Sequence, residues 1–172
     1  MMQNERIRAA YERNAKAMQR NPGVAQDTET VTCRIIDGLR CEVTDGVHTV
    51  TADEPEGYGG TDAGPTPGFL IRGGLASCFA ISVMMRAAVG GVPVDALEVT
   101  VESDHDMRGA FGLADVPKGF TAVRVRVTIQ SSAPEAAVRK VIDEADDFSP
   151  MLAFAREPHG VAREVTIVPT VT

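Results

Sequence analysis

The sequence predicts an α+β fold in which antiparallel strands pack with helices. Two observations exclude a doubly wound parallel sheet and favour this class: the strand-like segments are grouped instead of alternating strictly with helices, and Asp-Gly turn signals separate the first of them. A third observation is a long apolar segment near the middle of the chain, which has the length of a helix. The expected order is helix, three strands, helix, two strands, helix, strand.

The first 53 residues predict a helix followed by a small sheet. Residues 3–20 place apolar side chains at helical spacing, and the sequence Asn-Pro-Gly that follows stops the pattern. Residues 29–53 are rich in β-branched side chains and are interrupted by Asp37-Gly38 and Asp45-Gly46. Because Asp-Gly is typical of two-residue hairpin turns, we expect three short antiparallel strands.

Two cysteines flank the first predicted hairpin. A two-residue turn at Asp37-Gly38 pairs Arg34 with Cys41 and Cys33 with Glu42. This register predicts that the two thiols lie on opposite faces of the sheet, as fillers in their strands.

A loop and a long helix occupy the centre of the chain. Residues 54–68 are rich in Gly and Pro and predict a loop, and Pro67 suits the first turn of a helix over residues 68–89. This helix is apolar on nearly every side, so it must be covered all round. Gly73 and Gly74 in its interior favour the close approach of another backbone, which could come from a second subunit.

The last third of the chain predicts two strands, a helix and a final strand. Residues 96–103 and 121–130 alternate as strands, joined by a long connection. A capping-box spacing from Ser132 to Glu135 opens a helix that we expect to end at Pro150. Residues 162–171 predict the closing strand.

Composition and charge limit the partners. The 172 residues, with 44% hydrophobic and 24% charged, are typical of one soluble globular domain. The net charge of −7 offers no basic surface for nucleic acid. The charged N-terminal segment does not resemble a secretory signal, and the apolar run between Arg72 and Arg86 is shorter than the roughly 17 residues that span a bilayer. We expect a cytoplasmic location with no membrane partner.

The sequence indicates no metal or cofactor. The three cysteines are not grouped as C-x-x-C and the three histidines are scattered singly, so neither a disulfide framework nor a zinc site is predicted. The Gly-rich loop lacks the Lys-Ser/Thr of a phosphate-binding loop and is interpreted as a turn. The adjacent His105 and Asp106 have no nucleophile tied to them, which favours a solvated loop.

Cys78 admits two interpretations. Free cysteine is among the most often buried residues, so Cys78 can be a small apolar filler. A reactive thiol would need a neighbouring cation, because Cys78 lies about ten residues into the helix and the helix dipole fades within the first turn. The residues alone leave both interpretations open.

Several motifs together resemble the OsmC/Ohr family, the osmotically induced and organic hydroperoxide resistance proteins. They are, in chain order, "GGTDAGPTP", "LASCFA", "VESDHDMRGAFG", "VPKGF", "SSAP" and "SPM", and they fall within about residues 30 to 170. The resemblance implies a single OsmC-like domain over 1–172, with 1–24 as an N-terminal helical extension and 25–172 as the core. It also implies an intertwined homodimer in which antiparallel sheets wrap around central helices, with thiol sites at the subunit interface.

The same resemblance implies a thiol-dependent peroxidase site. Cys78 matches the cysteine that attacks the peroxide, Ser149 stands where the family has its second, resolving cysteine, and Gly68 stands where it has a glutamate. The family's activating arginine lies in the first hairpin, where Arg34 or Arg40 is available, although the best alignment places Ile36 there.

Two functions of different classes follow. In the first, the protein reduces an organic hydroperoxide through Cys78 alone, and an external thiol reduces the resulting sulfenic acid. In the second, the dimer binds a small hydrophobic ligand at the subunit interface without turnover.

Overall fold

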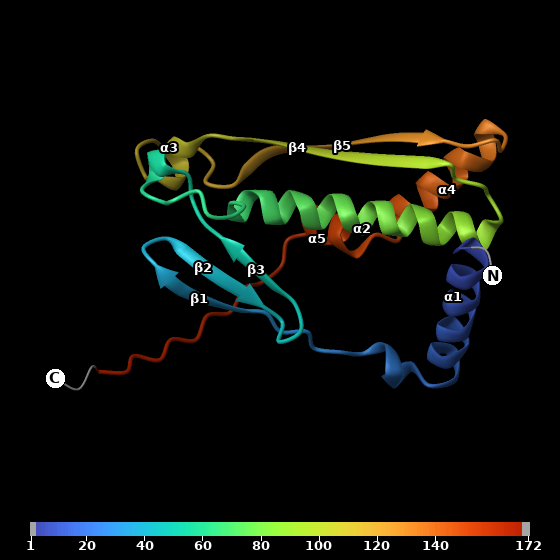
Figure 1. The fold of residues 1–172 in the computed structure, drawn as a ribbon, viewed down its shortest axis with the longest axis horizontal. Helices are drawn as coiled ribbons and strands as arrows, with labels where there is room; N and C mark the ends of the chain where they lie inside the picture. Colours follow the sequence, from blue (N-terminus) through green and yellow to red (C-terminus); the bar gives the residue numbers. More distant parts are fainter. Residues whose placement is uncertain (1–2, 170–172) are drawn as a thin grey trace.

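The structure is a computed structural model that describes residues 3–169, and it confirms the α+β class (Figure 1). Its long helices are α1 (Gln3–Arg20), α2 (Pro67–Gly90), α4 (Glu135–Asp147) and α5 (Pro150–Arg156). Its strands are β1 (Thr32–Asp37), β2 (Arg40–Thr44), β3 (Thr49–Ala52), β4 (Ala96–His105) and β5 (Phe120–Gln130). The short helical turns are η1 (Pro22–Ala25), η2 (Glu56–Tyr58) and α3 (Met107–Ala110).

Helix α2 is the element against which the others pack. Its ends follow from the sequence: the hydroxyl of Thr66 accepts a hydrogen bond from the Phe69 N–H, Pro67 occupies the first turn, and Gly91 ends the helix in the left-handed conformation with φ 67°. The two-stranded antiparallel sheet β4–β5 runs along one side of α2, and α4 packs beside it (Figure 1). Helix α1 meets the C-terminal end of α2, and the three-stranded sheet β1–β2–β3 lies near its N-terminal end (Figure 1).

The core is formed by one stripe of α2. Residues Leu75, Phe79, Val83 and Ala87 recur every four positions and are buried. They pack against buried residues of α4 and α5, which are Val138, Val141, Ala145 and Leu152, and against the inward-facing residues of β4–β5. Each fully buried aliphatic or aromatic side chain contributes about 1.5 to 3 kcal/mol, so this stripe is the main source of stability.

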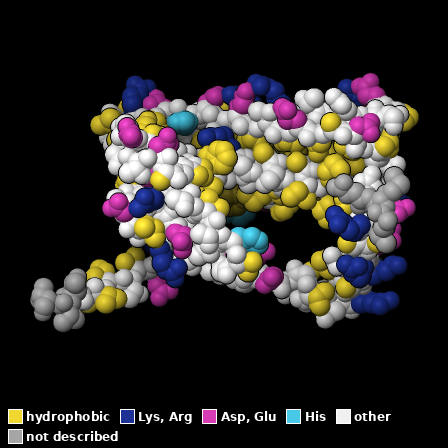
Figure 2. Space-filling model, viewed as in Figure 1, with side chains coloured by type: hydrophobic (Ala, Val, Ile, Leu, Met, Phe, Trp, Pro, Cys, Tyr) yellow, Lys and Arg dark blue, Asp and Glu magenta, His cyan; other side chains and the backbone are white. Residues whose placement is uncertain are grey.

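The opposite side of α2 is apolar and uncovered. Ile71 is 50% exposed, Ile81 59% and Met85 37%. Figure 2 shows the molecule hollowed between α1 and the sheet β1–β3, with hydrophobic side chains gathered on the wall of the hollow over α2. By length and composition alone α2 is apolar enough to cross a membrane, a property that the core helices of soluble proteins share. Only 17% of its most apolar 18-residue stretch is buried inside the chain.

The register of the first hairpin differs from the prediction. The turn residues are Gly38, with φ 57°, and Leu39, and the pairing shifts by one residue between Ile35 and Asp37. As a result Cys33 faces Val43 and Cys41 faces Ile35. Because side chains alternate between faces, both thiols lie on the same apolar face of the sheet, and the prediction of opposite faces was wrong.

The two thiols also interact. A hydrogen bond with the Cys33 thiol, followed by partial burial, raises the pKa of Cys41. Both cysteines are free, with Cys33 exposed and Cys41 half-buried.

Three other predicted boundaries were wrong. Helix α4 begins after Pro134 with no side-chain cap, while Ser131 accepts the Ala133 N–H and donates to the carbonyl of Pro93, so the capping box at Ser132 does not form. Helix α4 ends at Asp147, three residues before the predicted end at Pro150, and Pro150 begins a further helix, α5, that the sequence did not predict. Residues 162–169 form no strand and extend away from the body, because no strand of the same chain pairs with them (Figure 1); positions 170 and 171 of the predicted strand lie outside the described residues.

The Gly-rich loop before α2 is organised by Asp53. This residue is 2% exposed, and its carboxylate accepts hydrogen bonds from the Thr61 hydroxyl at 2.6 Å and from the backbone N–H groups of Glu54, Thr61 and Ala63. These hydrogen bonds lower the pKa of Asp53 to about 2, and the one from the Thr61 hydroxyl has the largest effect. A Cβ at Gly64 would lie 2.3 Å from the carbonyl oxygen of Thr51, so the tight loop requires glycine there.

The hairpin register predicts a chemical cross-link. Dibromobimane, which becomes fluorescent when it bridges two nearby thiols, should link Cys33 to Cys41 in a Cys78→Ser background, because the two thiols share a face. Fluorescence and peptide mapping measure the product. Loss of the signal in Cys33→Ser is the control, and a failure to bridge the native pair would contradict the register.

The Asp53 network predicts a pH-dependent loss of stability. Since folding depresses the pKa of Asp53, its stabilisation is present above the unfolded pKa and disappears as the pH falls from about 4 through about 2. Urea unfolding followed from about pH 6 to about pH 2.5 should show Asp53→Asn less stable than wild type near neutrality, with the difference shrinking across this window. Asp143→Asn, which changes an exposed acid on α4, is the matched control; an unchanged stability in Asp53→Asn at neutral pH would contradict the role of Asp53.

Candidate functional site

Cys78 on α2 and Ser149 before α5 form the centre of the candidate site. The Cys78 Sγ and the Ser149 Oγ lie 3.7 Å apart, although the residues are separated by 71 positions in the chain. Cys78 is half-buried and Ser149 is 2% exposed. The structure therefore brings together the two positions that the family resemblance pairs.

Ser149 is held in place by the start of α5. Its hydroxyl accepts a hydrogen bond from the Leu152 N–H at 3.3 Å, and Pro150 occupies the first position of the helix. A serine N-cap followed by proline is a common way to begin a helix, so the local sequence fixes the hydroxyl opposite the thiol. The same contact gives Ser149 a structural role that is independent of any chemistry.

An arginine and two aromatic rings pack together next to the segment that carries Ser149. The Arg86 guanidinium carbon lies 4.6 Å from the ring centre of Phe148 and 5.6 Å from that of Tyr11, and Arg86 donates a hydrogen bond to the Tyr11 hydroxyl at 3.2 Å. Cation–π contacts of this kind connect α1, α2 and the segment that carries Ser149. Sequence analysis missed this arrangement because its members are far apart in the chain.

The remaining predicted site residues lie elsewhere. Arg40 forms an ion pair with Asp37 at 3.8 Å across the first hairpin turn and makes no hydrogen bond with Cys78. Gly68 lies in the first turn of α2, ten positions before Cys78. Within the described chain, 3–169, no carboxylate or arginine is hydrogen-bonded to the Cys78 thiol.

The two glycines inside α2 have different surroundings. A Cβ at Gly74 would lie 3.7 Å from the Met151 methyl group of α5, whereas the nearest atom to a Cβ at Gly73 belongs to Phe69 of the same helix. Gly74 thus faces a helix of its own chain, one turn from Cys78. Gly73 leaves open the space that a second subunit was expected to fill.

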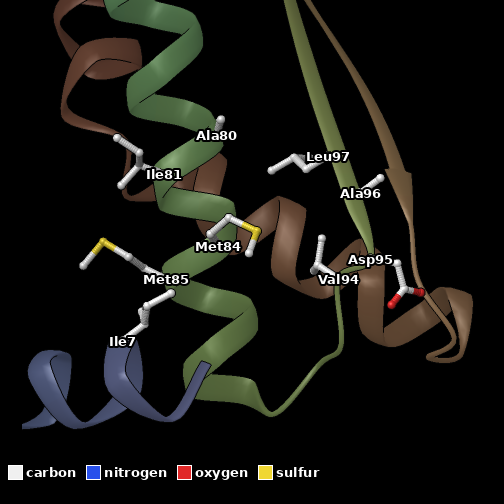
Figure 3. A pocket seen from close by; sticks show the side chains of 9 residues that line it. All are labelled: Ile7, Ala80, Ile81, Met84, Met85, Val94, Asp95, Ala96 and Leu97. Carbon is white, nitrogen blue, oxygen red and sulfur yellow. The ribbon is translucent and has the colours of Figure 1, made fainter. Parts of the chain in front are cut away.

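An apolar pocket lies along α2 beyond Cys78 (Figure 3). It has a volume of about 580 Å³ and lies between α1, α2 and the start of β4. The residues that line it are Ile7, Ala80, Ile81, Met84, Met85, Val94, Asp95, Ala96 and Leu97. Eight of these nine side chains are apolar, and only Asp95 is charged, so the pocket suits a hydrophobic molecule.

Among the residues that the structure describes, no group of three or more His, Cys, Asp or Glu side chains could hold a metal ion. The candidate site offers the Cys78 thiol, and the neighbouring Ser149 hydroxyl can donate or accept one hydrogen bond with it.

The sequence profile of the OsmC-like protein family matches residues 59–160, a region that includes both Cys78 and Ser149. The chain belongs to the OsmC-like protein family. No curated protein matches the chain in sequence.

Solved structures of OsmC-like proteins share the fold. An OsmC-like protein from Mycoplasma pneumoniae superposes with a TM-score of 0.66 at 17% identity, covering 76% of this chain and 89% of that one. An organic hydroperoxide resistance protein from Legionella pneumophila gives a TM-score of 0.57 at 21% identity, covering 76% and 92%. An organic hydroperoxide resistance protein from Elizabethkingia anophelis gives a TM-score of 0.55 at 20% identity, covering 76% of this chain and 91% of that one.

The capping role of Ser149 predicts a stability effect. Ser149→Ala removes the acceptor for the buried Leu152 N–H and should lower the free energy of unfolding by about 1 kcal/mol. Urea denaturation of the two proteins measures the difference. Ser132→Ala, whose side chain makes no cap, should change it little, and an equal effect of both substitutions would contradict the assignment.

Proposed function

We propose that the protein is a thiol-dependent redox protein of the OsmC-like family that reduces organic hydroperoxides through Cys78. The observation that carries the proposal is the 3.7 Å contact between the Cys78 thiol and Ser149, which stands at the family's resolving position. Support also comes from the structural relatives named as organic hydroperoxide resistance proteins. In this proposal the protein acts in the cytoplasm, where it contributes to the defence against oxidative stress.

The proposed reaction begins at the Cys78 sulfur. The thiolate attacks one oxygen of the hydroperoxide, the O–O bond breaks, and the alkoxide leaves with a proton as an alcohol, so that Cys78 is oxidised to a sulfenic acid. Because Ser149 has no thiol, it cannot close a disulfide with this intermediate. An external thiol then forms a mixed disulfide with Cys78 and releases water, and a second thiol restores Cys78 and leaves as a disulfide with the first.

We infer that the active form is a homodimer. The uncovered apolar side of α2 and the hollow beneath it favour a second copy, because exposing an apolar face of this length to water is unfavourable. The dimer would bring the hairpin of one subunit toward the thiol site of the other, which is where an activating Arg40 would act. In this arrangement residues 25–172 form the core of one domain and residues 1–24 its N-terminal extension.

A second candidate function is the binding of a small hydrophobic ligand without turnover. The apolar pocket of Figure 3 favours it, since Ile81 and Met85 lie along α2 from Cys78 and line a cavity of about 580 Å³. In this case Cys78 would be only a small apolar residue near the pocket.

The redox proposal predicts a trappable intermediate. Organic hydroperoxide should convert Cys78 to a sulfenic acid that reacts with dimedone, because no thiol at position 149 consumes it. Mass spectrometry of the peptide that contains Cys78 measures the adduct, and Cys78→Ser should abolish both the adduct and peroxide consumption in the presence of small thiols. Consumption that persists in Cys78→Ser would refute the proposal and favour ligand binding.

The matched variant is Ser149→Cys. It places a second thiol opposite Cys78, so a disulfide should form between Cys78 and the introduced thiol, water should leave, and the dimedone adduct should disappear. Cys33→Ser and Cys41→Ser should leave the Cys78 adduct unchanged. A dimedone adduct that persists undiminished in Ser149→Cys would show that the two side chains do not meet in solution.

A further inference from the structure

A second pocket lies at the other end of α2, next to Gly68. It has a volume of about 560 Å³ and lies between the loop around η2, the first turns of α2, and the adjoining ends of β4 and β5. Its apolar wall includes Tyr58, Ile71, Met107 and Phe120. This pocket shares no lining residue with the apolar pocket near α1.

The charged groups of this pocket are mainly cationic. Arg72 and Lys118 line it together with His105, and Glu54 is the one acid among its lining residues. His105 lies edge-on to the Phe120 ring, with 6.4 Å between the ring centres. In an acidic protein with a net charge of −7, a pocket with two fixed positive charges and one negative charge is a local exception that favours an anion.

Arg72 has no ionic partner in the part of the chain that the structure describes. Its single hydrogen bond is to the Ser103 hydroxyl, at 3.3 Å, and it takes part in none of the ion pairs that the other arginines form. Because a guanidinium has five N–H donors, most of the hydrogen-bonding capacity of Arg72 is available to a ligand.

Gly68 leaves space directly in front of this guanidinium. A Cβ at position 68 would lie 3.4 Å from Arg72 Nη1 and 3.9 Å from Nη2, so a longer side chain there would project onto the same group. A glutamate at this position could satisfy Arg72 from within the chain. With glycine, position 68 supplies no carboxylate, so the Arg72 guanidinium is open to the carboxylate of a ligand.

We propose that this pocket binds a small organic carboxylate with an apolar body. The planar carboxylate pairs with the Arg72 guanidinium through two parallel hydrogen bonds, Lys118 adds a second positive charge, and the apolar body lies against Ile71, Tyr58 and Phe120. The apolar wall disfavours inorganic anions, and Glu54 disfavours ligands with several negative charges. This binding is independent of the reaction proposed for Cys78.

The test is calorimetric titration of the full-length protein with octanoate, 1-octanol and inorganic phosphate. Octanoate should bind, while octanol and phosphate should bind at least about 10-fold more weakly, since one lacks the charge and the other the apolar body. Absence of octanoate binding, or equal binding of octanol, would overturn the proposal.

Substitutions locate the site. Arg72→Gln should weaken octanoate binding by about 10- to 100-fold. Arg72→Lys keeps the positive charge but not the paired N–H donors of the guanidinium, so it should weaken binding less. Gly68→Glu should abolish binding by pairing with Arg72, and it is expected to fold because an acid in the first turn of a helix is favourable. The matched control Gly68→Ala adds only a Cβ and should retain most of the affinity.

Cys78→Ser separates this inference from the proposed redox function. Its octanoate affinity should equal that of wild type even though peroxide consumption is lost. Octanoate affinity that is unchanged in both Arg72→Gln and Gly68→Glu would refute the assignment of the site, whatever the result for Cys78.

Discussion

The structure depends on the need to keep α2 out of water. One stripe of this helix, from Leu75 to Ala87, is buried against β4–β5, α4 and α5, and this packing fixes where the other elements lie. The opposite side, with Ile81 and Met85, faces a hollow instead of a core (Figure 2). Within the described residues, one chain keeps only part of α2 out of water, and the proposed second copy would cover the rest.

The same helix places the three features that bear on function. Cys78 shares its side of α2 with Ile81 and Met85, and the residue at the start of α5, Ser149, meets its thiol there, so Cys78 is half-buried. The apolar pocket near Met84 lies toward the C-terminal end of α2, and the cationic pocket at Arg72 lies toward its N-terminal end. Within the described residues, the arginines closest to Cys78 in sequence are Arg72 and Arg86, and their hydrogen bonds go to Ser103 and Tyr11.

The sequence predicted what local chemistry determines and missed what distant contacts determine. Periodicity and turn signals predicted the strands β1 to β5 and the helices α1, α2 and α4, and the family resemblance predicted that Cys78 and Ser149 lie close together. The prediction of the hairpin register was wrong because the pairing shifts by one residue near Ile36, and such a shift moves the side chains of one strand to the other face of the sheet. The helix α5 was missed because Ser149-Pro150 was interpreted as an end instead of a cap, and the roles of Asp53 and Arg72 depend on loops that fold back onto them.

Light scattering coupled to size-exclusion chromatography tests the central claim, that a second copy covers α2, most directly. At micromolar concentration the account predicts a folded particle with twice the 18.3 kDa mass of the chain, and a substitution of Ile81 by Asp should weaken the association, because Ile81 belongs to the uncovered side. A stable monomer with native circular dichroism at the same concentration would contradict it.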